Sequence, residues 1–194
     1  MSVNIEKLID ASLFFLSKDG HPFSKKRLNY FLVMADTKHM EHHTIGITDD
    51  IINSLPSGPR LHLTTQIFNG YMFTEQWRQH FVLTNDNQLL IKHGRLPASL
   101  SDAEKETLKQ VFTRYGDLGE QSINYILQSS GMEWHENGST KFNPFLFFKS
   151  LGFNNENARQ RQEVYFDHMN MDRSSLNDFF DRYNQCENAS TEMA

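Results

Sequence analysis

Cysteine is almost absent from this sequence, which contains only Cys186 among 194 residues. One cysteine cannot form a disulfide within the chain, and chains of this kind are typical of the reducing cytosol. The first residues show no basic region followed by an apolar stretch, so no secretory leader is predicted. The longest apolar runs, such as Leu13–Leu16, are far shorter than the roughly 20 residues that cross a bilayer. We therefore expect a cytoplasmic protein that does not contact a membrane.

Basic charge and glycine-rich loops are also scarce. The formal net charge is -5, whereas a general nucleic-acid-binding protein carries a basic stripe. Gly131 and Gly138 stand alone, and the chain has no Gly-Lys-Ser or Gly-Lys-Thr sequence that could form a phosphate-binding loop. These absences argue against a nucleic-acid partner and against a P-loop nucleotide-binding enzyme.

Phenylalanine is abundant instead. The chain has 16 phenylalanines, and 12% of its residues are aromatic, so a domain of this length has ample core material. Apolar residues recur at helical spacing in several segments. These predicted helices span about residues 5–16, 24–35, 61–68, 101–115, 123–131, 144–151 and 156–183. The polar residues His39–Thr44 are predicted to form a loop after the second helix.

Two regions have the pattern of β-strands. His80–Thr84 and Gln88–Lys92 flank a short Asn/Asp loop and predict a hairpin. Ile51–Leu55 predicts a strand that ends in the turn Pro56-Ser57-Gly58-Pro59. Proline is favoured at the first position of a helix, so we expect Pro59 to start the next helix. The predicted fold class is α+β: a mostly α-helical domain with a small antiparallel β-sheet or hairpin and a helical C-terminal extension.

The composition changes after about Asn137, where Asn, Phe, Arg and Asp become frequent. We interpret residues 1–137 as the main domain and residues 138–185 as a helical extension, because about 50 residues are few for a separate core. Residues 186–194 have little to bury and are predicted to form a mobile tail. Within the main domain, Ser101 and Glu104 fit a capping box at the start of a helix.

Several short motifs follow one another in a defined order between about residues 4 and 137. The first are Pro22, Ser24, Leu28, Leu32 and Ala35 in the helix pair, then Gly46, Asp49, Ile51, Gly58 and Pro59 around the turn. After the hairpin come Leu100, Ser101, Glu104, Tyr115, Gly116 and Leu118, and finally Trp134. Each motif consists of a few common residues. Their joint order and spacing resemble the Panacea antitoxin domain, also called the SocA-like antitoxin domain.

The resemblance implies an interaction protein. Members of this family are mostly antitoxins that bind and neutralise a partner toxin, and some act as adaptors that hand the toxin to a protease. They are frequently encoded on phages and other mobile genetic elements. No catalytic residue, metal or cofactor belongs to the family pattern, so the resemblance implies that the chain is not an enzyme and takes no cofactor.

The chain departs from the family at the predicted turn. Leu55-Pro56-Ser57 replaces the aromatic or basic residues that usually precede Gly-Pro, and Arg60 replaces the usual apolar residue after it. These departures make Leu55, Ser57 and Arg60 candidates for partner contact. The remaining turn residues are assigned a structural role: Pro56, Gly58 and Pro59.

A second candidate surface lies in the Phe-rich extension. Aromatic residues are dense between Phe142 and Tyr183, and an apolar patch left exposed there would bind a partner protein or a second copy of the chain. Phe145 and Phe148 are the candidate contacts, and packing against the main domain is the alternative. The basic run Lys25-Lys26-Arg27 is either a solvated helical face or an anchor for an acidic partner or a nucleic acid.

Other classes of function remain open at this point. One is an inhibitor of a host protein encoded by a phage or mobile element, and another is a nucleic-acid-associated regulator. A third is a metal-dependent enzyme, for which the candidate groups are His39, His42 and His43 with Glu41 and Asp36, and the pair Asp49-Asp50. The plainer interpretations are a polar helix end for the histidines and turn residues for the aspartate pair. Cys186 is interpreted as an unreactive thiol.

Overall fold

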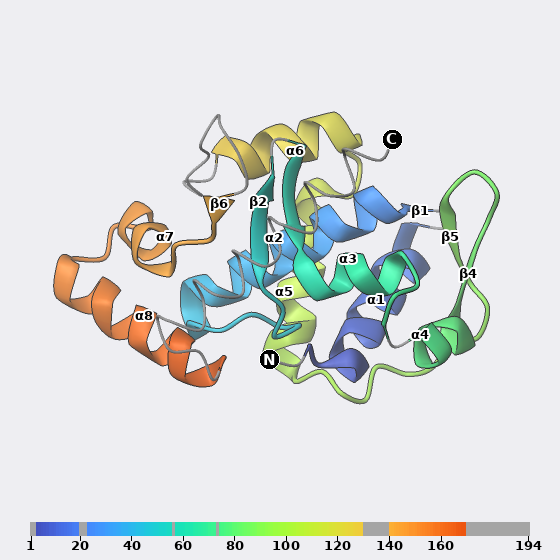
Figure 1. The fold of residues 1–194 in the computed structure, drawn as a ribbon, viewed down its shortest axis with the longest axis horizontal. Helices are drawn as coiled ribbons and strands as arrows, with labels where there is room; N and C mark the ends of the chain where they lie inside the picture. Colours follow the sequence, from blue (N-terminus) through green and yellow to red (C-terminus); the bar gives the residue numbers. More distant parts are fainter. Residues whose placement is uncertain (1–2, 20–22, 56, 73, 130–139, 170–194) are drawn as a thin grey trace.

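A computed structural model describes residues 3–19, 23–55, 57–72, 74–129 and 140–169 of the protein. This part of the chain folds into eight helices and six short strands around one hydrophobic core (Figure 1). The helices are α1 (Ile5–Asp19), α2 (Lys25–His43), α3 (His62–Phe68), α4 (Thr74–His80), α5 (Asp102–Tyr115), α6 (Glu120–Ser129), α7 (Pro144–Ser150) and α8 (Asn155–His168). The strands are β1 (Phe23–Ser24), β2 (Ile52–Leu55), β3 (Gly58–Leu61), β4 (Phe81–Leu83), β5 (Gln88–Ile91) and β6 (Thr140–Lys141).

The predicted fold class is confirmed. The described residues are mostly helical, and their strands form two small antiparallel sheets, with the orders β1-β5-β4 and β3-β2-β6. The predicted capping box is also present at the start of α5, where the Ser101 and Glu104 side chains each bond the backbone N–H of the other residue. None of the described helices combines the length and the apolarity that a membrane span needs.

Helix α2 runs through the centre of the molecule and is buried on almost every side. Tyr30, Phe31 and Leu32 have no exposed surface, and helices α1, α3, α5 and α6 contact α2 (Figure 1). Ser24 caps the helix as predicted, because its hydroxyl oxygen accepts a hydrogen bond from the N–H of Arg27 at 3.0 Å. The other elements are therefore arranged around α2.

The loop predicted for His39–Thr44 is wrong, because α2 continues to His43. The buried side of the helix extends through Met40, which is 1% exposed. The helix ends at Thr44, which takes a left-handed conformation with φ 72° and donates its N–H to the carbonyl of Met40. Of the polar residues that suggested a loop, His42 and His43 are exposed, whereas His39 is buried on the inner side of the helix.

The segment after the Pro-Ser-Gly-Pro sequence is also different from the prediction. It continues as strand β3, which pairs antiparallel with β2, with Pro59 opposite Ser54 and Gly58 opposite Leu55. The next helix, α3, begins only at His62, so Pro59 does not start it. Pro59 instead lies within a short hairpin strand, where a residue without an N–H is tolerated if its ladder position needs no donor. Pro56 lies outside the described residues.

The hairpin predicted from residues 80–92 is confirmed as β4–β5. The other edge of β5 pairs with β1, where Phe23 lies opposite Leu89, and this pairing ties the hairpin to the beginning of α2. Helix α4 was not predicted, because Trp77 is the only apolar residue in its sequence and one apolar residue shows no helical period. It leads directly into β4 and buries Trp77 against the core.

The Phe-rich segment packs on the same core through β6, α7 and α8. Strand β6 pairs with β2, and Phe142, Phe148 and Tyr165 belong to the hydrophobic cluster that contains α2. Helix α7 confirms the predicted helix 144–151. The described part of the last predicted helix is α8. Its continuation to residue 183, together with Trp134, Cys186 and residues 186–194, lies outside the described residues.

Candidate functional site

The β2–β3 hairpin carries the three candidate contacts predicted from its turn. Leu55 is only 7% exposed and packs inward, whereas Ser57 is exposed. Arg60 is half-buried, and its Nη2 donates a hydrogen bond to the Ser57 hydroxyl at 2.7 Å. The Tyr30 hydroxyl of α2 donates to the Ser57 carbonyl at 2.8 Å. The structure therefore brings Ser57 and Arg60 together at the surface and leaves little of Leu55 for a partner.

Gly58 has the structural role predicted for it. Its φ of 110° lies in the region that favours glycine. A Cβ atom at this position would lie 2.0 Å from Oδ1 of Asn124 and 2.8 Å from the hydroxyl oxygen of Tyr30. Helices α2 and α6 therefore approach the turn so closely that only glycine fits.

The described part of the second predicted surface, which ends at residue 169, is largely core, and the prediction of Phe148 as a partner contact is wrong. Phe148 has no exposed surface, and its ring centroid lies 5.3 Å from that of Phe147 and 6.1 Å from that of Phe153. Phe145 is partly buried against the same cluster. Arg161 covers this cluster, with its guanidinium 4.2 Å from the Phe153 ring centroid. The described aromatic residues at this end of the molecule pack mainly against one another.

The histidines at the end of α2 take structural positions. His39 and His43 share one face of the helix, and their rings stack with centroids 4.2 Å apart. Nδ1 of His39 lies 2.9 Å from the carbonyl oxygen of Ile45, and burial lowers the pKa of the His39 ring. Within the residues that the structure describes, no group of three or more His, Cys, Asp and Glu side chains could hold a metal ion.

Asp36 forms hydrogen bonds with the loop that follows α2. Its Oδ1 accepts hydrogen bonds from the N–H groups of Ile47 at 2.9 Å and Thr48 at 3.1 Å, and its Oδ2 accepts one from the Thr48 hydroxyl at 2.5 Å. Burial raises the pKa of Asp36 to about 7, although these hydrogen bonds oppose the shift. This carboxyl group was one of the predicted metal candidates, and it has a structural role.

Asp50 caps the N-terminus of helix α3, although it lies 13 residues before Leu63 in the sequence. Leu61, at the N-cap of α3, offers no side-chain acceptor, and the Asp50 carboxylate accepts from the N–H groups of Leu63 at 2.9 Å and Thr64 at 2.7 Å. Burial raises the pKa of Asp50. Its neighbour Asp49 has a φ of 56° and lies 2.7 Å from Nε2 of His168. The aspartate pair therefore points in two directions and does not form one site.

A hollow lies between α3, α4, the β4–β5 hairpin and the first turn of α2. This outer cavity has a volume of about 500 Å³, within the range of ligand and peptide sites. Phe68, Trp77 and Phe81 line it, with ring centroids 5.0 Å apart for the first pair and 4.0 Å for the second. These rings are nearly buried and form a rigid apolar wall.

A smaller inner cavity of about 160 Å³ adjoins the outer cavity and shares Lys25, Phe68 and Asn69 with it. It lies between α2, β3 and α3, and Arg60 is one of its lining residues. One of the contacts predicted from the turn therefore lies on a cavity. We call the two adjoining cavities together the basic groove.

The charge of the basic groove is the opposite of the charge of the whole chain. Five cationic side chains line it, and no Asp or Glu is among its described lining residues. The five are Lys25, Lys26, Arg60, Arg78 and Lys92. None of them forms an ion pair with a described carboxylate. Like charges gathered in a hollow focus a positive field there, in a chain whose net charge is -5.

Apolar side chains are exposed beside these cations. Val82 is 47% exposed and Leu83 is 40% exposed, and both line the outer cavity at the β4 strand. Strand β4 is also the outermost strand of its sheet. The basic groove therefore offers a partner both positive charge and apolar surface, which is the mixture found at protein interfaces.

Sequence reasoning found only part of this groove. Lys25 and Lys26 belong to the basic run that was considered as an anchor for an acidic partner, and Arg60 was a predicted contact. Arg27, the third residue of that run, is structural instead: it donates to the Gly116 carbonyl at 2.6 Å and lies 4.5 Å from the Phe23 ring centroid. The missed residues are Trp77, Arg78 and Lys92. The pair Trp77-Arg78 ahead of a predicted hairpin was the available signal.

No model of a known family, no curated protein and no solved structure matches the chain.

Proposed function

We propose that this protein is a binding protein of the antitoxin type, which neutralises a partner toxin or delivers it to a protease. The basic groove is the proposed contact surface. Its occupant is a segment of the partner protein that carries acidic and apolar side chains. The observation that carries this proposal is the set of five cations around an apolar wall, with no acidic residue among the described lining residues.

Charge complementarity supports an acidic partner. Uncompensated cations in a concave, partly apolar surface attract acidic groups and speed their encounter. The exposed aliphatic side chains of β4 would lose water when a partner segment covers them, which adds apolar burial to the electrostatic attraction. The choice of a toxin as the partner rests on the resemblance described above and on no feature of the groove itself.

A protein segment suits the groove better than a nucleic acid. Single-stranded nucleic acids stack their bases on aromatic faces that are open to solvent. Trp77 is 5% exposed and Phe81 is 2% exposed, so neither ring offers such a face. The net charge of -5 also opposes a long polyanion outside the groove.

The experiment first identifies the partner and then tests the groove. Affinity capture with mass spectrometry, together with the product of the adjacent gene, supplies the candidate toxin. The candidate is expressed in a host that it arrests, with the wild-type chain or with Arg78→Glu/Lys92→Glu. Wild type should restore growth, and the groove variant should not. The matched control, Lys109→Glu/Arg114→Glu on α5, changes the same charge outside the groove and should restore growth.

Two results would overturn the proposal. One is full neutralisation by the groove variant. The other is a candidate partner that forms no complex with the purified wild-type chain. In either case a different surface or a different function must be sought.

A further inference from the structure

The inner cavity of the basic groove differs chemically from the outer one. Its cations come from two elements that are far apart in the sequence, Lys25 and Lys26 from the first turn of α2 and Arg60 from β3. Neutral polar side chains of Asn29, Thr65 and Asn69 also line it. The rings of Tyr30 and Phe68 complete the lining, so this cavity of about 160 Å³ combines apolar surface with three cations, which are suited to a small anionic group.

The cations are not already neutralised within the described structure. Glu120 is a described carboxylate on this side of the molecule, and its charge contributes to raising the pKa of the Tyr30 hydroxyl, after the larger effect of burial. Glu120 accepts a hydrogen bond from the Ser24 hydroxyl and is not among the residues that line the cavity. The positive end of the α2 helix dipole lies at the same place as Lys25 and Lys26 and adds to the attraction for an anion.

Arg60 is held in position by the turn. Its Nη2 donates to the Ser57 hydroxyl, and the Ser57 carbonyl accepts from the Tyr30 hydroxyl, so the side chain is anchored to α2 through one residue. A guanidinium group has five N–H donors in a fixed fork, and this contact uses one. The remaining donors bond no other described residue, so an oxyanion can use them in the paired hydrogen bonds that arginine forms.

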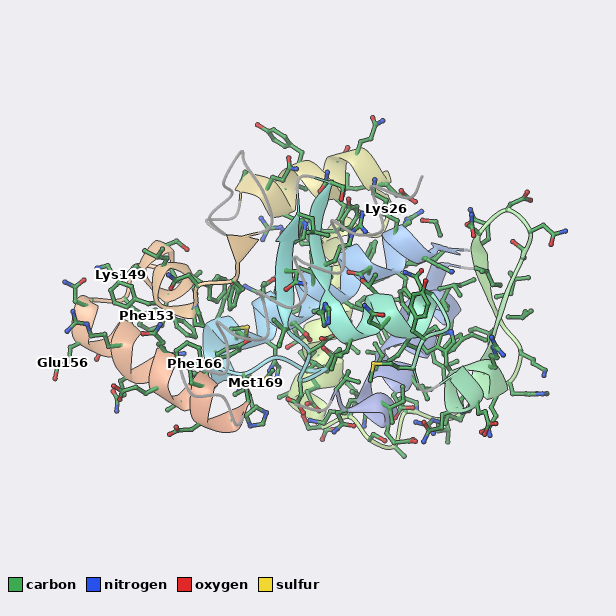
Figure 2. All side chains as sticks on the ribbon, in the orientation of Figure 1. Lys26, Lys149, Phe153, Glu156, Phe166 and Met169 are labelled. Atoms are coloured by element: carbon green, nitrogen blue, oxygen red, sulfur yellow. The ribbon has the colours of Figure 1, made fainter. Side chains whose placement is uncertain are left out.

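We propose that the inner cavity binds a phosphoryl group, presented by a phosphorylated side chain of the partner segment. Three cations exceed what one carboxylate needs. A phosphate monoester carries about -1.5 to -2 charges at pH 7 and offers three strong acceptor oxygens, which match three cationic donors. The identity of the carrier rests on the proposed function, because the adjoining outer cavity would receive the neighbouring apolar side chains. Figure 2 shows Lys26 at the beginning of α2, away from the α7–α8 end where Phe153 and Phe166 lie.

The test uses the full chain and three simple anions at matched ionic strength: sodium phosphate, sodium acetate and sodium chloride. Binding is followed by titration with backbone amide NMR and by the unfolding temperature. Phosphate should bind with saturation, raise the unfolding temperature and shift amide signals within residues 24–30 and 57–69. Lys26→Gln/Arg60→Gln should weaken phosphate binding at least about tenfold, because it removes two of the three cations that line the cavity. Lys109→Gln/Arg114→Gln should leave phosphate binding unchanged.

Three outcomes would overturn the inference. They are the absence of saturable phosphate binding, equal binding of acetate, and phosphate binding that Lys26→Gln/Arg60→Gln does not weaken. The unfolding temperature of the double variant without phosphate shows that it is folded. Treatment of the purified partner with a phosphatase should weaken its complex with the wild-type chain. An unchanged complex would overturn the inference that the partner presents the phosphoryl group.

The two proposals fail separately. Arg78 and Lys92 line only the outer cavity, whereas Lys26 and Arg60 line only the inner one. If phosphate binds as expected but Arg78→Glu/Lys92→Glu still neutralises the toxin, the proposed function at the groove is wrong and the anion site stands. If the toxin experiment succeeds and phosphate does not bind, only the phosphoryl inference is wrong.

Discussion

The two ends of this molecule contain similar aromatic residues in opposite settings. At the α7–α8 end (Figures 1 and 2), Phe148 and its neighbours pack against one another within the hydrophobic cluster that also contains residues of α2. The guanidinium of Arg161 lies 5.5 Å from the Phe148 ring centroid. At the end formed by α4 and the β4–β5 hairpin, Trp77 and Phe81 line a cavity whose cationic lining residues form no ion pair with a described carboxylate. Aromatic density therefore does not identify a binding surface. The informative feature is apolar surface beside charges that nothing in the described chain neutralises.

The largest predicted effect removes a ring from the packed end. Phe148→Ala should lower the free energy of unfolding by about 4 kcal/mol, because the ring is fully buried and its removal leaves a cavity. Chemical denaturation measures this loss. Phe145→Ala, at a partly buried position of the same helix, is the matched control and should cost clearly less. Equal losses at the two positions would contradict the packing described here.

The second prediction concerns the turn between the two ends. Gly58→Ala should lower the free energy of unfolding by about 3 kcal/mol, since it adds both an unfavourable φ and an overlap with Asn124. Differential scanning calorimetry checks the change. Gly119→Ala is the control, because a Cβ atom there meets nothing within 4 Å. The inner cavity adjoins this turn, so Gly58→Ala should also weaken phosphate binding.

The third prediction concerns the pH dependence of stability that the buried carboxyl group of Asp36 causes. Burial raises the pKa of Asp36 in the folded protein to about 7, above its ordinary value of 3.8, so the folded protein holds an extra proton between these two values. This group therefore contributes stability at low pH that is lost as the pH rises from about 4 to about 7, with a slope of at most about 1.4 kcal/mol per pH unit.

Asp36→Asn cannot titrate and should flatten this dependence. The measurement is the free energy of unfolding at several pH values for the wild type, for Asp36→Asn and for the exposed control Asp86→Asn. The control should follow the wild type. A wild-type stability that rises between pH 4 and 7, by an amount that Asp36→Asn abolishes, would contradict the assigned direction of the pKa shift.

The smallest predicted effect on stability is at the groove. Arg78→Glu/Lys92→Glu should change the free energy of unfolding by no more than about 0.5 kcal/mol per residue, because both side chains are exposed and unpaired. Urea denaturation measures this directly. A loss of several kcal/mol would mean that these cations stabilise the fold. Their presence in the basic groove would then no longer indicate a contact surface.

Local patterns were enough to predict much of the fold. The Ser24 cap, the Ser101–Glu104 capping box and the β4–β5 hairpin depend on residues close together in the sequence, and all three are present. The errors came from contacts between distant residues. Pairing with β2 makes Pro59 part of a strand, and core packing carries α2 through its polar last turn.

The candidate site was harder to predict than the fold. Its cations come from α2, β3, α4 and the residue after β5, so they approach one another only in the folded chain. The sequence identified Lys25, Lys26 and Arg60 separately, each with an ordinary alternative interpretation. The sequence could not distinguish the buried Phe148 from the cavity-lining Trp77. Both residues lie in short helices that contain polar as well as apolar residues.

The most direct test of the central claim is the dissociation constant of the purified complex between this chain and its partner. Isothermal titration calorimetry compares the wild type, Arg78→Glu/Lys92→Glu and the control Lys109→Glu/Arg114→Glu. The groove variant should bind at least about tenfold more weakly, a difference of about 1.4 kcal/mol, while the control binds like the wild type. Equal affinities for all three proteins would contradict the assignment of the basic groove as the contact surface.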